Sequence, residues 1–185
     1  MMKRNNFPFS AVLGLNHAKT AILIVLVNPR AGGLLISGPR GIGKSTLMRS
    51  TQELIERPWR DIPVSVTEDR LFGTIDTEKA IYSGQKKLYP GIINEADQGV
   101  LYLDDANLLR EDLLDFILNI AEVGAYQLER DGLSLRCDTS FTVIAAINPE
   151  SGMLSGACLD QFGLFVNVDN IHDENTRVER SEEHT

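Results

Sequence analysis

Basic side chains, cysteines and long apolar runs are scarce in this sequence of 185 residues, and each scarcity excludes a class of protein. The 18 basic side chains are outnumbered by 26 acidic ones, and the net charge of −8 would repel the phosphate backbone of a nucleic acid. The two cysteines, Cys137 and Cys158, have no second ligand at metal-binding spacing, which favours a reduced compartment. Residues 21–27, the longest apolar stretch near the start, fall far short of the roughly 20 residues of a membrane span. We therefore expect a cytoplasmic protein whose partners include neither nucleic acid nor membranes.

Short apolar runs alternate with helical patterns along the chain, which is typical of a single α/β domain. Helices are expected over 44–56 and 111–123. A β-hairpin is expected over 126–135, because Asp131-Gly132 lies there between two extended stretches. Strands are expected over 34–37, 63–66, 99–103, 141–147 and 164–168. Consecutively apolar strands separated by helices predict a parallel sheet of about five strands, covered by helices on both faces, from which the hairpin projects.

A glycine-rich motif directly follows the first expected strand and directly precedes a helix. Residues 38–45, Gly-Pro-Arg-Gly-Ile-Gly-Lys-Ser, match the P-loop pattern G-x-x-x-x-G-K-[ST] in the context that this motif requires. Glycines let successive N–H groups point at phosphate oxygens, and the helix adds its positive end. The pattern predicts that Lys44 reaches the β and γ phosphates of ATP and that Ser45 ligates Mg²⁺. The nucleotide-binding residues are expected to be Gly38, Pro39, Arg40, Gly41, Ile42, Gly43, Lys44, Ser45 and Thr46.

Acidic and amide side chains follow two later strands, where a phosphate-bound Mg²⁺ needs a partner. Asp104 is expected to hold the metal through water. Asp105, pointing to the other side, is expected to orient or deprotonate the attacking water. Asn148 is a candidate hydrogen-bond partner of the γ phosphate or of that water; the alternative is a turn residue before Pro149. Lys44, Asp104, Asp105 and Asn148 thus form the predicted catalytic set, with Ser45 and Asp104 at the metal.

The motifs, taken in order, resemble the I subunit of magnesium chelatase, an AAA+ ATPase. The resemblance covers about residues 7–180. The segments that carry it are 9–14, 38–45, 67–76, 89–91, 94–96, 99–109, 129–132, 148–150 and 159–163. It implies a P-loop NTPase fold with an AAA+ core, an insert in the 73–89 region and a hairpin before the Asn148 strand.

The resemblance also implies partners and a reaction. Such subunits form homo-oligomeric rings, which join a second AAA+-related subunit and a large porphyrin-binding subunit. ATP hydrolysis then drives insertion of Mg²⁺ into protoporphyrin IX, in chlorophyll or bacteriochlorophyll synthesis.

The chain departs from the family pattern at positions that matter for hydrolysis. Asp105 stands where the family has Glu, and Gln161 stands where it has the arginine that would reach a neighbour's γ phosphate. An arginine expected slightly earlier is Ser155. Arginine fingers contribute roughly 10³ to 10⁵ in rate. These departures keep open a nucleotide-dependent scaffold or switch with impaired hydrolysis as an alternative to a motor ATPase. An AAA+ chaperone of the MoxR type is a further alternative.

The end of the sequence is also unlike the family. The core is expected over 1–172, with a short acidic tail at 173–185 and no helical lid after it. Residues 180–185 are similar to a translated sequencing adapter, which predicts an artificially cut reading frame; a natural acidic tail is the other interpretation.

Overall fold

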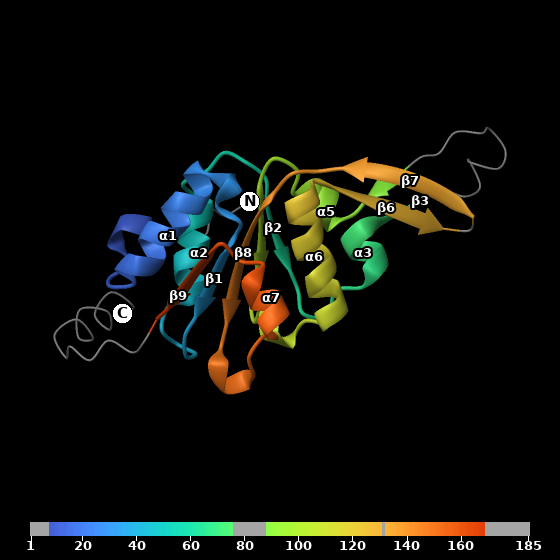
Figure 1. The fold of residues 1–185 in the computed structure, drawn as a ribbon. Helices are drawn as coiled ribbons and strands as arrows, with labels where there is room; N and C mark the ends of the chain where they lie inside the picture. The colour runs from blue at the N-terminus through green and yellow to red at the C-terminus, as the bar shows by residue number, and fades with distance from the viewer. Residues whose placement is uncertain (1–7, 76–87, 131, 169–185) are drawn as a thin grey trace.

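A central parallel sheet with helices on both faces organises the protein (Figure 1). The computed structural model describes residues 8–75, 88–130 and 132–168. The sheet has five strands in the order β2-β5-β8-β1-β9. Their bounds are Leu34–Ser37 for β1, Trp59–Ile62 for β2, Val100–Leu103 for β5, Thr142–Ile147 for β8 and Leu164–Asn167 for β9. All four pairings in this sheet are parallel, as predicted.

Two apolar cores lie on opposite faces of the sheet because side chains alternate along each strand. In β1, Leu34 and Ile36 belong to one core, whereas Leu35 belongs to the other. The first core is covered by α1 (Asn16–Val27) and α2 (Lys44–Gln52). The second is covered by α3 (Glu68–Phe72), α5 (Ile92–Glu95), α6 (Glu111–Val123) and α7 (Gly156–Asp160). None of the described helices is long and apolar enough to cross a bilayer.

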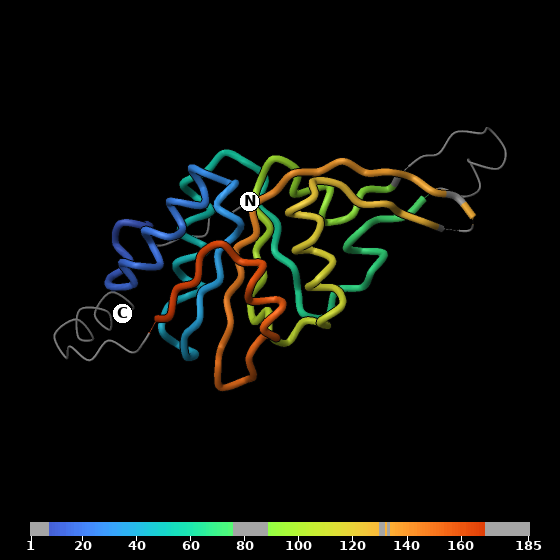
Figure 2. Tube along the Cα trace, in the orientation of Figure 1, coloured from blue at the N-terminus to red at the C-terminus, as the bar shows by residue number. Residues whose placement is uncertain are grey.

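Two antiparallel pairs and four short 3₁₀ turns complete the described structure. The strand β3 (Gly73–Ile75) pairs with β4 (Leu88–Pro90), and β6 (Ala125–Arg130) pairs with β7 (Leu133–Asp138). The β6–β7 hairpin extends away from the sheet (Figure 2). The 3₁₀ turns are η1 (Phe9–Ala11), η2 (Pro29–Ala31), η3 (Ala106–Leu108) and η4 (Pro149–Ser151).

The structure confirms most of the predicted elements and corrects one strand. The predicted strand at 63–66 is wrong: β2 lies at Trp59–Ile62, and residues 63–66 form a turn closed by the Val66 N–H to Pro63 C=O hydrogen bond of 2.9 Å. The α2 helix ends at Gln52 rather than at residue 56. The bounds of α6 agree with the prediction, and Gly124 ends this helix with φ of 78°. The predicted insert at 73–89 and the predicted tail at 173–185 fall largely or wholly outside the described residues.

The register places the ends of three strands at one edge of the sheet. Ser37 of β1 is aligned with Ile147 of β8, and Leu103 of β5 is aligned with Ala145 of the same strand. The P-loop after β1, the acids after β5 and Asn148 after β8 are therefore neighbours, with β8 between the other two strands. This carboxyl edge is where open α/β sheets bind ligands.

Candidate nucleotide-binding site

The P-loop runs from the buried strand β1 into α2 and depends on its glycines. A Cβ atom at Gly38 would lie 2.6 Å from the carbonyl oxygen of Val168, so this backbone approach needs glycine. Gly41 and Gly43 have φ of 80° and 94°, in the left-handed region that glycine adopts without strain. No side chain caps α2 at Gly43, so its first-turn N–H groups are available to an anion.

Lys44 lies at the mouth of this loop with only 8% of its surface exposed. Its Nζ donates hydrogen bonds to the carbonyl oxygens of Gly38, at 2.5 Å, and Pro39, at 2.9 Å. Burial lowers the pKa of Lys44 below the ordinary 10.5, and the carboxylates of Asp104, Asp105 and Glu150 partly oppose that shift. The ammonium group is thus poorly solvated and held toward the loop. Because there is little water around it, its electrostatic attraction to a phosphate is stronger than it would be in bulk water.

Ser45 and Asp104 meet across the sheet edge although they are 59 residues apart in the chain. The Ser45 hydroxyl donates to Oδ2 of Asp104 at 3.0 Å. Alternation along β5 explains the position of Asp104: Leu101 and Leu103 face the α6 core, so the next side chain points toward α2. A hydroxyl and a carboxylate side by side are oxygen donors of the kind that Mg²⁺ accepts.

Asp105 does not point to the other side of the strand end, contrary to expectation. It has φ of 50°, and this left-handed turn brings its side chain to the same pocket as Asp104. There, Oδ2 of Asp105 lies 3.8 Å from Nη2 of Arg40. The pocket has a volume of about 310 Å³ and is lined by Arg40, Gly41, Gly43, Lys44, Ser45, Thr46, Asp104 and Asp105.

The side chain of Asn148 is engaged in a turn. It is 2% exposed, its Oδ1 accepts from the Glu150 N–H at 3.2 Å, and its Nδ2 donates to Ser151 Oγ at 3.1 Å. It caps η4 and does not line the P-loop pocket. The geometry thus favours the turn interpretation, while a contact to phosphate or water stays a prediction.

Two further residues contribute to the site and were missed from the sequence. Asn107 in η3 donates from Nδ2 to the carbonyl oxygens of Asn148 and Gly152, at 3.3 and 3.0 Å, which ties the loop of the two acids to η4. Glu150 in η4 acts on the pKa of Lys44. A polar residue two positions after the acid pair was the available signal for Asn107, whereas nothing in the local sequence links Glu150 to the P-loop.

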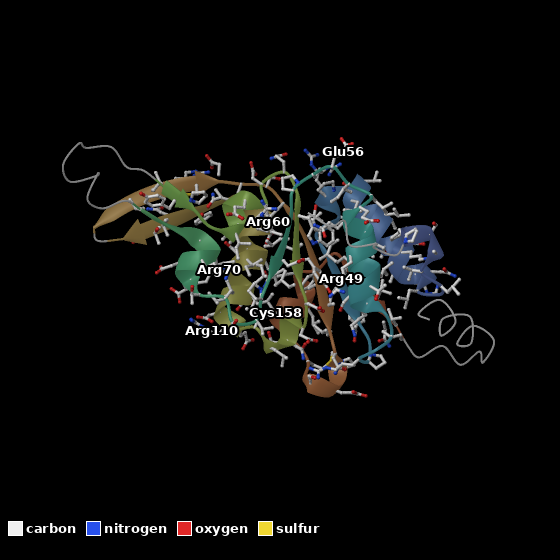
Figure 3. All side chains as sticks on the ribbon, turned by 180° about the vertical axis from the view of Figure 1, so that it is seen from behind. Arg49, Glu56, Arg60, Arg70, Arg110 and Cys158 are labelled. Atoms are coloured by element: carbon white, nitrogen blue, oxygen red, sulfur yellow. The ribbon has the colours of Figure 1, made fainter. Side chains whose placement is uncertain are left out.

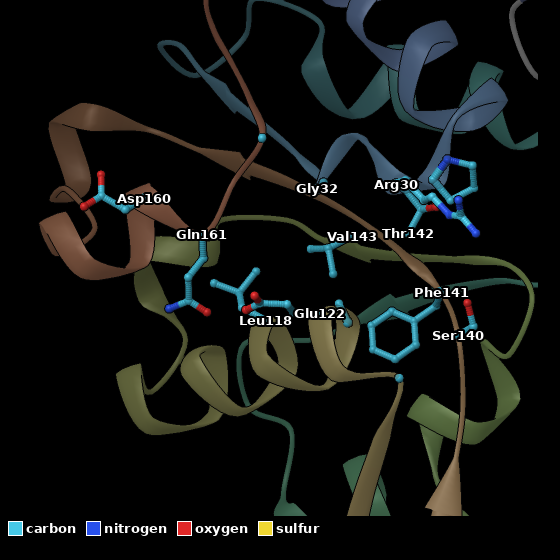
Figure 4. A pocket seen from close by; sticks show the side chains of 15 residues that line it. Arg30, Gly32, Leu118, Glu122, Ser140, Phe141, Thr142, Val143, Asp160 and Gln161 are labelled. Atoms are coloured by element: carbon cyan, nitrogen blue, oxygen red, sulfur yellow. The ribbon is translucent and has the colours of Figure 1, made fainter.

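Gln161 lies at the opposite edge of the sheet. It lines a pocket of about 600 Å³ at the amino ends of the strands, marked by Gly33 before β1 and Thr142 at the start of β8. Figure 4 shows the Gln161 side chain pointing toward Leu118, with Arg30 across the pocket. Residue 161 therefore cannot reach a phosphate bound at the P-loop of the same chain.

Several arginines are spread over the surface, and at least two of them pair with acids. Figure 3 labels Arg49 on α2 and Arg60 on β2, with Arg70 and Arg110 farther along the same face. Arg60 pairs with Glu95 at 2.9 Å, and Arg110 pairs with two nearby carboxylates. Among these labelled arginines, the positive charge is therefore dispersed rather than gathered into a basic patch.

Comparison with known proteins identifies the family. The model of the AAA domain (dynein-related subfamily) matches residues 33–161. The magnesium-chelatase 38 kDa subunit of Cereibacter sphaeroides is 37% identical over 206 aligned residues, which cover 94% of this chain and 62% of that protein. The magnesium-chelatase subunit ChlI homolog of Methanocaldococcus jannaschii is 33% identical, over 97% of this chain and 59% of that protein.

A solved structure agrees with these relatives. A chain of the BchI–BchD complex of magnesium chelatase, based on a 7.5 Å cryo-EM reconstruction, superposes with a TM-score of 0.82 at 36% identity. The match covers 97% of this chain and 66% of that chain, so this chain spans about three fifths to two thirds of the length of these relatives. The chain belongs to the AAA domain family, and over nearly its whole length it is homologous to the ChlI/BchI subunit of magnesium chelatase.

Proposed function

We propose that this chain binds ATP with Mg²⁺ and hydrolyses it as a motor subunit of a magnesium-chelatase-like assembly. The observation that carries the proposal is the Ser45–Asp104 hydrogen bond of 3.0 Å beside the uncapped start of α2. This hydrogen bond places the two side chains that would bind nucleotide-bound Mg²⁺ next to the N-terminus of α2, which would bind a phosphate.

The residues present fit this ligand. The first-turn amides of α2 and the Lys44 ammonium would bind the phosphates, the Ser45 oxygen would ligate Mg²⁺, and the Asp104 carboxylate would hold the ion through water. When bound, the ion would neutralise charge that develops on the phosphates. Asp105 would orient or deprotonate the attacking water. Among the described residues, no cluster of three or more His, Cys, Asp or Glu is placed to hold a metal ion by itself, so the site relies on phosphate oxygens as further ligands.

We infer the partners and the reaction from the homology to magnesium-chelatase subunits. We infer a homo-oligomeric ring that joins a second AAA+-related subunit and a porphyrin-binding subunit, with ATP hydrolysis driving Mg²⁺ insertion into protoporphyrin IX. The superposed relative is a complex between two chelatase subunits, BchI and BchD, which supports this inference. The position of Gln161, at the edge of the sheet remote from Lys44, is consistent with residue 161 acting on a neighbouring subunit.

A second candidate is a nucleotide-dependent scaffold with impaired turnover. It is favoured by Gln161, which carries no charge for a neighbour's phosphate, and by Asp105, whose carboxylate is paired with Arg40. Both candidates require Lys44, Ser45 and Asp104, so binding alone does not separate them.

Steady-state ATPase turnover of the chain and of its Lys44→Ala and Gln161→Arg variants separates the two. A motor predicts measurable turnover that Lys44→Ala abolishes. A scaffold predicts nucleotide binding without turnover, and restoration of turnover by Gln161→Arg. If neither chain nor variants bind ATP in the presence of Mg²⁺, both candidates are wrong.

A further inference from the structure

Tyr102 carries a buried hydroxyl group for which the described residues offer no hydrogen bond of good geometry. The residue lies in the middle of β5 and is 5% exposed. Native proteins pair nearly all buried polar groups, and an unpaired hydroxyl incurs its desolvation cost without return. Tyr102 lies two residues before Asp104, a candidate for holding the metal, which suggests that its unpaired hydroxyl has a role at that site.

The ring of Tyr102 is fixed in the core beneath the Ser45–Asp104 pair. Val100 and Tyr102 face the α2 core, and Asp104 follows on the same face of the strand. The ring packs against Trp59 of β2, with centroids 5.9 Å apart and planes tilted by 40°. This packing leaves the hydroxyl within interaction range of Asp104 and Ser45.

A phenol keeps its proton at neutral pH, so the buried Tyr102 hydroxyl can donate a hydrogen bond. Asp104 has an exposed side chain whose Oδ2 accepts from Ser45, and a donor on the core side would restrict its rotation.

We propose that Tyr102 is a positioning residue that donates a hydrogen bond to Asp104 when Ser45 and Asp104 together hold the nucleotide-bound Mg²⁺. When Mg²⁺ binds the Ser45 oxygen, the hydrogen bond from Ser45 to Asp104 is lost. Asp104 then needs another donor to fix its orientation, and the buried Tyr102 hydroxyl is within range. Partners that orient metal ligands affect metal affinity by roughly 10- to 100-fold. This inference rests on the proposed binding of ATP with Mg²⁺.

The test compares the chain with its Tyr102→Phe variant, which keeps the ring and removes only the hydroxyl. MgCl₂ is titrated into each protein with a non-hydrolysable ATP analogue, and binding is followed by calorimetry and by emission of Trp59, the single tryptophan of the chain. We expect Tyr102→Phe to weaken Mg²⁺ binding roughly 10-fold, while analogue binding in EDTA is unchanged. Because Trp59 contacts the ring, its emission should change on Mg²⁺ addition in the parent chain, and less in the variant.

Stability without Mg²⁺ supplies a second readout and a matched control. Removal of an orphan hydroxyl should leave the unfolding midpoint of Tyr102→Phe equal to or above that of the parent chain. The control is Tyr126→Phe. In the parent chain, the Tyr126 hydroxyl donates to Phe72 O at 2.8 Å and contacts Asn94 Oδ1 at 2.5 Å, near α3 and α5. That variant should unfold at a lower temperature and bind Mg²⁺ as the parent does.

Three outcomes would overturn the inference. Equal Mg²⁺ affinity in the parent and Tyr102→Phe removes the positioning role while the proposed function stands. A lower midpoint for Tyr102→Phe without Mg²⁺ means that the hydroxyl already has a structural partner. Absence of any Mg²⁺-dependent nucleotide binding in the parent chain contradicts the proposed function, and the inference with it.

Discussion

The Arg40 guanidinium and the Asp105 carboxylate, at 3.8 Å, join the P-loop to the loop that follows β5. The two side chains are 67% and 36% exposed, so water screens the pair, and it stabilises the fold by about 0.5 kcal/mol or less. The main effect of this ion pair is to orient the Asp105 side chain at the rim of the pocket. The left-handed backbone at Asp105, with ψ of 47°, is the other determinant of that position.

We first predict the effect of substituting Asp105 on stability. Aspartate and asparagine tolerate left-handed backbone, whereas a β-branched residue there is strained by about 1–2 kcal/mol. Asp105→Val should therefore lower the free energy of unfolding in urea by that amount, while Asp105→Asn and Arg40→Ala should each change it by about 0.5 kcal/mol or less. Equal stability of the Val and Asn variants would contradict the left-handed conformation.

The second prediction concerns pH. Because burial lowers the pKa of Lys44, the folded chain releases this proton at lower pH than an ordinary lysine of pKa 10.5. A bound phosphate favours the charged form, so binding takes up a proton, and affinity for ATP should fall as pH rises through the lowered pKa. The affinity is measured by calorimetry from neutral to alkaline pH in buffers of different ionisation enthalpy. Trp59 emission verifies that the fold survives, and a constant affinity up to pH 10.5 contradicts the prediction.

A matched pair of glycine substitutions tests the packing of β9. A Cβ atom at Gly163 would lie 1.6 Å from the carbonyl oxygen of Ala31, a backbone atom that cannot move away alone. Gly163→Ala should therefore cost about 3 kcal/mol of unfolding free energy. Gly156→Ala meets nothing within 4 Å and lies at the start of α7, so it should be neutral or stabilise by about 0.5 kcal/mol. Thermal unfolding compares the two, and similar midpoints would contradict the close approach of the Gly163 backbone to the carbonyl oxygen of Ala31.

The fourth prediction is low reactivity of Cys158. The thiol is 1% exposed and donates to Asp115 Oδ1 at 2.9 Å. Burial raises the pKa of Cys158, and the contact with Asp115 adds to it, so little thiolate forms at neutral pH. In a Cys137→Ser background, a thiol reagent at pH 8 should modify Cys158 slowly in the folded chain and rapidly in urea. Rapid modification without urea would mean that α7 detaches easily from α6.

The central apolar strands were predictable from the sequence, whereas the edge strand β2 was not. The strands β5 and β8 are buried throughout, and their sequences are apolar except for Thr142 at the start of β8 and the hydroxyl of Tyr102. In β2, the sequence Trp-Arg-Asp-Ile buries only its two ends, and the β-branched Val64 and Val66 nearby favoured the wrong segment. The helix α1 was not predicted either. Its residues 21–27 were assessed only as a membrane span, and burial of one side of this run shows that it packs on the sheet.

The candidate site also has features that the sequence predicted and features that it did not. The P-loop motif predicted a glycine-dependent turn between β1 and α2, in which Gly41 and Gly43 have positive φ, and the strand-end rule predicted that Asp104 lies near Ser45. The contact of Lys44 with phosphates stays a prediction. The position of Asp105 was not predictable, because alternation ends where the backbone turns left-handed. Nor was the orphan hydroxyl of Tyr102, because the lack of a partner is a property of the packed core and not of the local sequence.

The order of strands in the sheet also has a consequence for synthesis on the ribosome. The strand β1, which ends in the P-loop, has β8 and β9 as its neighbours, so Leu34 finds its partners Ile144 and Leu164 only after most of the described chain has been made. Closing so long a loop is entropically costly and slows pairing. The P-loop of the nascent chain is therefore expected to lack its strand partners while the α6 side of the domain emerges, and nucleotide binding should become possible only after β8 and β9 have been made. Nascent chains arrested before Thr142 should accordingly fail to retain ATP, however complete their P-loop sequence is.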